Sequence, residues 1–370
     1  MNLQVGDEIE VTIEKLSFGG SGVARHNSLV HFVPFAAPKD RLRIKVTALK
    51  KNFAESEIVE ILEPGPSRRK APCPVAGVCG GCDWQQVTYQ EQLFQKNLFL
   101  KEHFQKVSKL KEVIIPDIEA TKEFNYRNRI QLKAQHGKLG YFARNSHNLV
   151  DIDHCPIADE KINEQIQILK VALRKSNQLQ RFELALQDDG AVTTVNLKDE
   201  DRSLGFSQVN QQQNLKLIAE TMRIVEDLSP TSIFDLYCGK GNFSFPLAER
   251  FPKIPFSGVD LGLAEIKEAR EKAKKGMRFF LSDVGAFLKR AEIEKNSLVV
   301  LDPPRAGLAS EVCKSIEFLS PQNIVYISCD PTSFSRDVER LEKYKVESVL
   351  AVDMFPQTSH IELVAHLKRP

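Results

Sequence analysis

Hydrophobic and polar residues follow two different patterns along the chain. Up to about residue 62, short segments alternate apolar and polar positions, and glycines and prolines separate them, as around residues 5–13, 42–46 and 57–61. Such alternation is typical of half-buried strands, and several short strands at close spacing predict a small β-barrel. After about residue 205, continuous apolar runs such as 232–237 and 324–327 end in polar turns. These runs predict the buried strands of an α/β sheet.

The region between these two parts mixes both patterns. Apolar residues at helical spacing predict a long amphipathic helix over residues 89–107, and two alternating runs, 126–132 and 138–142, predict strands. Arg127 and Arg129 fall on one face of the first strand, where they contact either phosphates or only solvent. We therefore expect an α/β protein with three domains, residues 1–62, 63–204 and 205–370.

Composition is that of a soluble globular protein. Of 370 residues, 42% are hydrophobic and 27% are charged, and the formal net charge is +2. The N-terminal residues lack the apolar core of a signal peptide and no run approaches a membrane span, so we expect a cytoplasmic protein. Local charge is more informative, because residues 39–51 carry six Lys and Arg against Asp40 alone. Such a basic strand face can follow a nucleic-acid backbone, although a solvated sheet face explains it equally well.

Seven cysteines in a chain without secretory features favour a metal site or catalysis over disulfides. Cys73, Cys79 and Cys82 are spaced as C-x5-C-x2-C, and the glycines between them allow the tight backbone that surrounds an ion or a cluster. Thiolate sites close at four ligands, and Cys155, which precedes a proline as Cys73 does, is the best fourth candidate. His154 ranks below it as a ligand. Zinc and an iron–sulfur cluster both satisfy this pattern.

Cys329 lies just after the apolar run 324–327, in the turn between this expected strand and an expected helix. Pro331 ends the strand, and Thr332 or Ser333 is expected to cap the helix. A residue in this position lies at the edge of an α/β sheet where active sites form. The N-terminus of a helix lowers the pKa of a nearby thiol, whereas the charge of Asp330 opposes that effect.

Successive buried strands of the C-terminal region carry acids within the strand or just beyond its end. These acids are Asp235, Asp260, Asp283 and Asp302. The first strand leads into a turn that contains Gly239 and Gly241, where a nucleotide-like ligand can approach the backbone closely. An acid about twenty residues further on is suited to ribose hydroxyls. The third glycine of the dinucleotide pattern is absent, so the series favours S-adenosylmethionine over NAD.

Several motifs resemble the RNA 5-methyluridine methyltransferase family, and the resemblance runs essentially from end to end. The N-terminal segment resembles a TRAM domain, an OB-like RNA-binding module. The motifs are FDLYCGKGNF at 234–243, LDPPRAG at 301–307, ISCDPT at 327–332 and HIE at 360–362. The resemblance implies a C-terminal Rossmann-like class I methyltransferase domain, an N-terminal OB-like barrel and a small α+β central domain.

The resemblance also implies roles for individual residues. Cys329 would be the nucleophile and Glu362 the base. Cofactor contacts would come from Gln208, Tyr237, Asn242, Asp260, Asp283 and Asp302. The iron–sulfur members of the family place four cysteines as Cys73, Cys79, Cys82 and Cys155 stand here, which favours a [4Fe-4S] cluster. Asp260 departs from the glutamate of many members, a change that shortens the arm toward the ribose.

The implied reaction is methylation of uracil C5 in RNA, with S-adenosylmethionine as methyl donor and the target base out of its stack. By the same resemblance, we expect a 23S rRNA target and a monomeric enzyme; the alternative target is uridine 54 of tRNA. The Asp-Pro-Pro motif also resembles amino methyltransferases, whose chemistry needs no thiol. A further alternative is a noncatalytic RNA-binding or assembly factor on a methyltransferase scaffold, against which the presence of both Cys329 and Glu362 argues.

Overall fold

The computed structural model describes residues 3–173, 177–197 and 207–370 and divides into two compact units. Neither unit is one continuous stretch of chain. Unit 1 comprises Met1–Phe99, Ala120–Leu204 and Phe355–Ser359, and unit 2 comprises Leu100–Glu119, Gly205–Met354 and His360–Pro370. No helix in the described part of the chain is long and apolar enough to cross a membrane.

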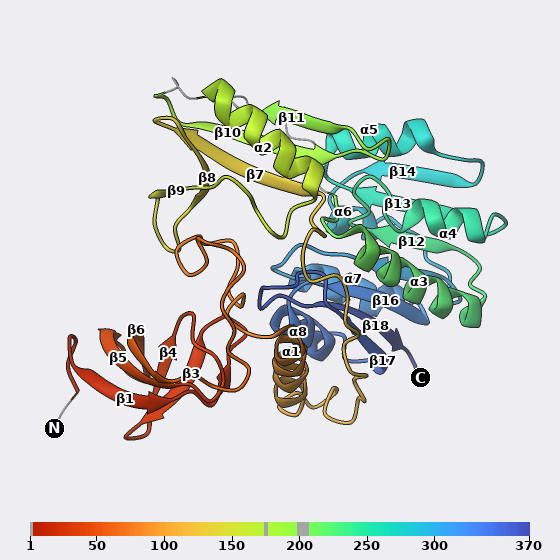
Figure 1. Ribbon diagram of the computed structural model, residues 1–370. Coiled ribbons are helices and arrows are strands. Elements are labelled where there is room, and N and C mark those ends of the chain that lie inside the picture. The colour runs from red at the N-terminus through yellow and green to blue at the C-terminus, as the bar shows by residue number, and fades with distance from the viewer. Residues whose placement is uncertain (1–2, 174–176, 198–206) are drawn as a thin grey trace. The chain divides into compact units, whose positions relative to one another are not determined.

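The N-terminal part of unit 1 is a six-stranded sheet in the order β1-β5-β6-β4-β3-β2 (Figure 1). Its strands are β1 (Glu8–Thr12), β2 (Lys15–Leu16), β3 (Gly22–His26), β4 (Leu29–Val33), β5 (Arg41–Leu49) and β6 (Phe53–Glu63). The apolar positions of the alternating segments face a common core that includes Val11, Val33, Leu42 and Ile44. β1 also contacts β3, which curls the sheet toward a barrel. The predicted strands of this region are confirmed.

The basic residues of β5 do not form a bare positive face. Arg43 Nη1 donates to Glu60 Oε2 on β6 at 2.6 Å, and Arg41 pairs with Glu63. Lys45 lies opposite acids on both neighbouring strands. Residues 1–63 as a whole hold eight Lys and Arg against nine Asp and Glu. The expectation of a basic strand face is therefore wrong for β5, because acids on β1 and β6 neutralise it.

The second part of unit 1 is a five-stranded sheet in the order β11-β10-β7-β8-β9 with one helix, α2, packed on it. The elements are β7 (Arg129–Gln135), β8 (Lys138–Phe142), β9 (Leu149–Asp151), α2 (Glu160–Leu173), β10 (Gln180–Leu186) and β11 (Val192–Asn196). Ile130 and Leu132 from β7 pack with Ile162 and Ile166 from α2 in its core. Strands were predicted for β7 and β8, and both are confirmed.

Helix α1 (Tyr89–Phe104) lies where a helix was predicted, but much of its buried surface is polar. Gln92, Gln95, Lys96 and Asn97 are buried, whereas Phe94 is 58% exposed. The prediction of a helix with an apolar buried face is thus only partly correct. The buried side chains on this helix include hydrogen-bonding groups, and their partners include backbone nitrogens of residues that are distant in sequence, Leu16 and Gln357.

Unit 2 contains a seven-stranded sheet in the order β14-β13-β12-β15-β16-β18-β17 (Figure 1). Its strands are β12 (Ile233–Leu236), β13 (Phe256–Asp260), β14 (Met277–Leu281), β15 (Leu298–Leu301), β16 (Asn323–Ser328), β17 (Lys345–Val352) and β18 (Glu362–Lys368). Its helices are α3 (Gln211–Leu228), α4 (Ser244–Arg250), α5 (Leu263–Lys272), α6 (Val284–Leu288), α7 (Ser310–Leu319) and α8 (Pro331–Arg340). The predicted α/β class is confirmed.

The direction of the strands decides which residues meet. β12 to β16 run parallel, so their carboxyl ends share one edge of the sheet. β18 is antiparallel to β16, with Ser328 opposite Leu363. The first residue of β18, Glu362, therefore lies at the same edge as Cys329, the residue after β16. Asp260 ends β13 and Asp302 follows β15 at that edge.

Arg129 has a structural partner rather than an open phosphate-facing position. Its Nε donates to Glu183 Oε1 at 2.7 Å, and the Glu183 side chain has no exposed surface. We predict that Arg129→Ala lowers the free energy of unfolding by about 3 kcal/mol, because it leaves a buried carboxylate without its counter-ion. Chemical denaturation checks this. Arg181→Ala, an exposed change on the same sheet, should shift stability by less than about 0.5 kcal/mol. Equal effects of the two substitutions would contradict the prediction.

Candidate active site

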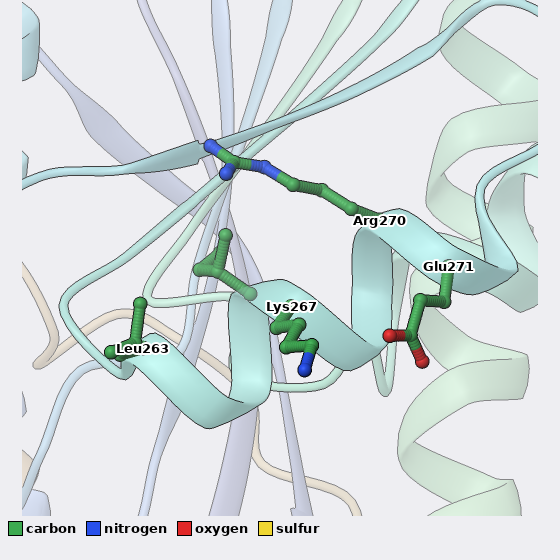
Figure 2. Close-up of a pocket in the computed structure, with 5 residues that line it drawn as sticks. Leu263, Lys267, Arg270 and Glu271 are labelled. Carbon is green, nitrogen blue, oxygen red and sulfur yellow. The ribbon is translucent and has the colours of Figure 1, made fainter.

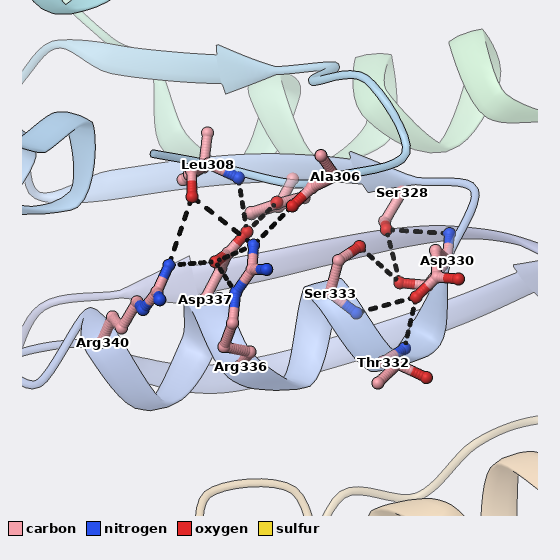
Figure 3. A network of polar contacts seen from close by, with 10 residues as sticks. Ala306, Leu308, Ser328, Asp330, Thr332, Ser333, Arg336, Asp337 and Arg340 are labelled. Carbon is pink, nitrogen blue, oxygen red and sulfur yellow. Dashed lines mark hydrogen bonds and ion pairs between the residues drawn. The ribbon is translucent and has the colours of Figure 1, made fainter. Parts of the chain in front are cut away.

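The turn that carries Cys329 is fixed by the cap of the following helix (Figure 3). Asp330 Oδ1 accepts hydrogen bonds from the backbone nitrogens of Thr332 at 2.9 Å and Ser333 at 2.8 Å. Pro331 occupies the first turn of α8, where its missing N–H costs nothing. The predicted caps, Thr332 and Ser333, are therefore wrong. Asp330 lies one residue before Pro331, where its carboxylate reaches both amides.

Asp337 braces this turn against the loop that follows β15 (Figure 3). Its side chain is fully buried and accepts from Leu308 N at 2.6 Å and from the Tyr326 hydroxyl at 2.8 Å. Arg336 Nε donates to its other oxygen at 3.0 Å. Gly307, at φ +72, passes so close that an added Cβ would lie 2.3 Å from the Asp337 carboxylate. Sequence reasoning missed this residue, which ties α8 to the loop after β15 at Leu308.

The Cys329 thiol holds its proton tightly. Burial raises its pKa to about 11, the charge of Glu362 acts in the same direction, and Arg305 lowers it. The expected lowering by the helix N-terminus is thus outweighed by desolvation. A nucleophilic thiolate here requires positive charge nearby.

Glu362 also favours its protonated form. Burial raises the pKa of its carboxyl well above the usual value, Asp302 adds to the rise, and Arg305 lowers it. Among the described residues, its Oε2 has no hydrogen-bond partner. Asp302 is partly exposed, yet desolvation and the charges of Asp235 and Asp260 raise its pKa to about 7. A buried carboxyl with raised proton affinity is suited to accept a proton.

Arg305 acts on both reactive groups. It lowers the pKa of Cys329 and that of Glu362, and its Nη2 lies 2.7 Å from Nδ1 of His360. Since a guanidinium can only donate, Nδ1 of His360 accepts this hydrogen bond. The donation makes His360 a poorer base through that nitrogen.

The glycine turn after β12 is shaped by Asp260. The two oxygens of its carboxylate accept from Gly239 N at 2.9 Å and from Gly262 N at 2.8 Å. Tyr237 holds a left-handed backbone conformation, φ +67, which non-glycine residues adopt mainly at functional sites. Asn242 exchanges two side-chain hydrogen bonds with Asn214 on α3. These contacts form a rigid turn at the edge of the sheet.

Two further predicted contact residues lie beside helix starts. Asp283 caps α6 by accepting from Ala286 N at 2.9 Å. Gln208 is partly buried and lies two residues before Asn210, the cap of α3. Asp235 is fully buried, accepts from Ser244 Oγ at 2.5 Å, and has its pKa raised to about 7 by desolvation.

Carboxyl groups thus gather at this edge with little compensating positive charge. Asp235, Asp302 and Glu362 all have raised pKa values. Desolvation is the main cause, and the negative charge of another carboxylate at this edge also disfavours the ionised form of each. Oδ1 of Asp235 has no partner among the described residues. A ligand that carries positive charge would relieve this repulsion. The residues present therefore fit a cationic sulfonium ligand.

Comparison with known proteins shows the family to which the chain belongs. Residues 183–370 match the family described as tRNA (Uracil-5-)-methyltransferase, and residues 2–59 match the TRAM domain. An uncharacterized RNA methyltransferase of Bdellovibrio bacteriovorus is 41% identical over 98% of this chain and 96% of its own. One from Aquifex aeolicus is 34% identical over 97% and 98%.

This chain belongs to the tRNA (uracil-5-)-methyltransferase family. It is an enzyme that acts on RNA with S-adenosylmethionine as methyl donor. The fold agrees, because the crystal structure of Pyrococcus abyssi tRNA (uracil-54, C5)-methyltransferase with S-adenosyl-L-homocysteine superposes with a TM-score of 0.75. That match has 25% identity and covers 97% of this chain and all of the other. The family resemblance seen in the motifs is confirmed.

A hollow beside α5 is lined by residues of that helix (Figure 2). Its lining contains none of the predicted catalytic or cofactor-binding residues. The lining residues are Leu263, Ile266, Lys267, Arg270 and Glu271. The position of the chemistry follows instead from the strand ends.

The four predicted metal ligands of the methyltransferase lie in one neighbourhood. The pKa of each of Cys73, Cys79 and Cys82 is raised, mainly by burial and partly by the charge of Cys155. The hydroxyl of Tyr141 donates to Cys155 Sγ at 3.9 Å. Over the described residues, however, no group of three or more possible ligands could hold a single metal ion.

We predict that Arg305→Gln slows alkylation of Cys329. Loss of the guanidinium raises the pKa of the thiol further, so at a fixed pH of 8 a smaller fraction is thiolate. The rate with iodoacetamide should fall between about three- and tenfold, since one pKa unit changes the thiolate fraction tenfold. Mass spectrometry of the Cys329 peptide measures it.

Arg278→Gln is the matched control for this experiment, because Arg278 is exposed on β14. Its alkylation rate should equal that of the unmodified chain. An unchanged rate in Arg305→Gln would show that Arg305 does not control the thiol.

Proposed function

We propose that the enzyme methylates C5 of a uracil in RNA through a covalent bond between Cys329 and C6 of the base. Glu362 then removes the C5 proton. The observation that carries this proposal is the antiparallel pairing of β16 and β18, which brings a cysteine and a buried carboxyl to one sheet edge. Transfer of a methyl group to an amine needs no such thiol.

The first step overcomes the weak nucleophilicity of uracil C5. The Cys329 thiol loses its proton to water, its sulfur forms a bond to C6, and the C5=C6 electron pair moves toward O4 as an enolate. Burial makes this ionisation costly in the protein alone. Arg305 and the positive charge of the donor favour the thiolate, so ionisation is coupled to binding of the substrates.

The second step forms the C5–methyl bond. When bound, S-adenosylmethionine would supply the methyl group. The bond between its sulfonium sulfur and the methyl carbon would break, which leaves the sulfur as a neutral thioether. C5 still carries its hydrogen. Glu362 must be a carboxylate at this point, so it first loses its own proton to water when the cationic donor binds. It then takes the C5 proton, the C5=C6 bond reforms, and the bond between C6 and Cys329 breaks as the sulfur leaves as a thiolate. The raised proton affinity of Glu362 supports this role.

The residues proposed to hold S-adenosylmethionine are those implied by the family motifs. Asp260 uses its carboxylate for two backbone amides, and a carboxylate has about four acceptor positions, so contact with a ribose hydroxyl is still available. The left-handed turn at Tyr237 supports close approach of the ligand. The proposed set is Gln208, Tyr237, Asn242, Asp260, Asp283 and Asp302.

We propose 23S rRNA as the target on the strength of the family resemblance, and uridine 54 of tRNA as the second candidate. The second is favoured by the tRNA (uracil-54, C5)-methyltransferase whose structure matches this chain. The TRAM domain would hold RNA with residues outside the neutralised face of β5, such as Lys50 and Lys51 in the turn before β6. We also propose a cytoplasmic monomer with domain boundaries near residues 62 and 204.

A [4Fe-4S] cluster on Cys73, Cys79, Cys82 and Cys155 is proposed for the central domain. Cys73 and Cys82 each lie close enough to Cys155 for its charge to raise the pKa of their thiols. The support for a cluster over zinc is the family resemblance, because iron–sulfur members place four cysteines as they stand here.

We predict that the two catalytic substitutions fail at different steps. Cys329→Ala should bind RNA and transfer no methyl group. Glu362→Gln should transfer the methyl and then stall as a methylated RNA joined to protein. The test uses radiolabelled S-adenosylmethionine with unmodified 23S rRNA and tRNA transcripts, and denaturing gels reveal the adduct and the RNA that forms it.

The adduct should require both the donor and the target uridine and should map to Cys329. Near-normal turnover by Cys329→Ala would exclude the covalent mechanism. Normal turnover by Glu362→Gln would keep the nucleophile and return the proton-accepting role to His360 or water.

We predict about four irons per chain in protein purified without oxygen, as the [4Fe-4S] assignment requires. Iron and zinc are measured by elemental analysis. Cys155→Ala should lose this iron and much of the folded protein, because the ligand segments are distant in sequence. Cys313→Ala, at a buried cysteine on α7, is the control and should keep its iron. Stoichiometric zinc without iron would overturn the cluster.

A further inference from the structure

The loop between β17 and β18 contains a segment that belongs to unit 1. Phe355–Ser359 is grouped with the N-terminal parts of the chain, while the residues on both sides of it belong to unit 2. Glu362 follows three residues after this segment, as the first residue of β18. The segment therefore ends immediately before the proposed base.

Gln357 is the fixed point of this segment. It is fully buried, and its carbonyl accepts from Asp83 N at 3.0 Å and Trp84 N at 3.1 Å. Its Oε1 accepts from Arg69 Nη2 at 3.0 Å, and its Nε2 donates to Glu123 Oε2 at 3.2 Å. Both main-chain and side-chain groups of Gln357 thus have partners within unit 1.

Gln92 on α1 forms a reciprocal pair with Gln357. Gln92 Nε2 donates to Oε1 of Gln357 at 3.0 Å, and Gln357 N donates to Oε1 of Gln92, also at 3.0 Å. Gln92 Nε2 also reaches the carbonyl oxygens of Trp84 and Val87, each at 3.0 Å. One buried amide therefore joins a helix, the loop after Cys82 and the segment before β18.

The backbone conformation of Gln357 is one that its surroundings must hold in place. Its φ is +70, a left-handed value that a non-glycine residue keeps only where its surroundings hold it. Lys96 Nζ adds a further bond to Phe355 O at 3.3 Å, and Tyr126 donates to Pro356 O at 3.0 Å. These contacts hold backbone groups of the segment that precedes β18 along the chain.

We propose that Gln357, held by Gln92 and the Asp83–Trp84 backbone, is a positioning residue for Glu362. The proposal rests on the role of Glu362 in the proposed function. Removal of the C5 proton needs the carboxylate at a defined place, and a displacement of about 1 Å can slow a reaction about a hundredfold. Cys329 lies in the turn between β16 and α8, outside this segment, so formation of the adduct does not depend on the segment in the same way.

The test variant is Gln92→Ala, and Gln95→Ala is its matched control. Gln95 is a buried glutamine one turn further along α1, and its Oε1 accepts from Leu16 N at 2.9 Å rather than from the segment. Both substitutions remove buried hydrogen bonds in the same unit. Only the first should alter release of methylated RNA.

In Gln92→Ala, single-turnover methyl transfer from labelled S-adenosylmethionine to the transcript used for Glu362→Gln should stay within about twofold of the control. Breakdown of the methylated adduct should slow between about ten- and a hundredfold, so the denaturant-resistant band accumulates. The KM for S-adenosylmethionine should not change, while kcat falls. Gln357→Gly, which tolerates φ +70 but lacks the side chain, should show the same pattern.

Each other outcome overturns the inference. Adduct breakdown equal to that of Gln95→Ala would show that the contact does not position the base. If Gln92→Ala slows methyl transfer as much as it slows breakdown of the adduct, the contact has a structural role only. The same conclusion follows if neither Gln92→Ala nor Gln357→Gly folds. Glu362→Gln is run in parallel. If it forms no adduct, the proposed chemistry fails; if it forms one and Gln92→Ala releases product normally, only the positioning role fails.

Discussion

The antiparallel pairing of β18 with β16 is the constraint on which the proposed chemistry of this enzyme depends. A parallel sheet alone brings only strand C-termini to its active edge, which explains the positions of Asp260, Asp302 and Cys329. Glu362 is the first residue of a strand, so it reaches that edge only because β18 runs in the opposite direction. The reversed direction of β18 therefore brings Glu362, the first residue of a strand, to an edge where the parallel strands place only their last residues.

Electrostatics at this edge favour catalysis only when substrates are present. The thiol and the carboxyl each retain their proton because they are desolvated and because they face other negative groups. Arg305 offsets part of that effect, and a sulfonium donor would offset more. In the proposed mechanism, Cys329 would therefore be little ionised until the substrates bind, and a thiol is less nucleophilic than a thiolate.

Sequence patterns could predict what depends on neighbours in the chain. The strands, the α/β class and the acids at strand ends follow from local apolar runs and turns. The cap of α8 was assigned to Thr332 or Ser333, although Asp330 lies one residue before the proline. The roles of Arg129 and Asp337 depend on Glu183 and Leu308, which are distant in sequence. The buried glutamines of α1 depart from the rule that buried helix faces are apolar. Their amide oxygens accept from backbone nitrogens of residues far away in sequence, Leu16 for Gln95 and Gln357 for Gln92.

The placement of Phe355–Ser359 also has a consequence for biosynthesis. Most of unit 1 lies in the first 204 residues and leaves the ribosome early, but its last piece is encoded near the C-terminus. Until that piece arrives, Gln92 and the Asp83–Trp84 backbone lack the partner they have in the finished protein. Domains usually fold as units in the order of their synthesis. Here the first unit to start folding is among the last to finish, so in a nascent chain truncated before residue 355 these polar groups would have water in place of their partner.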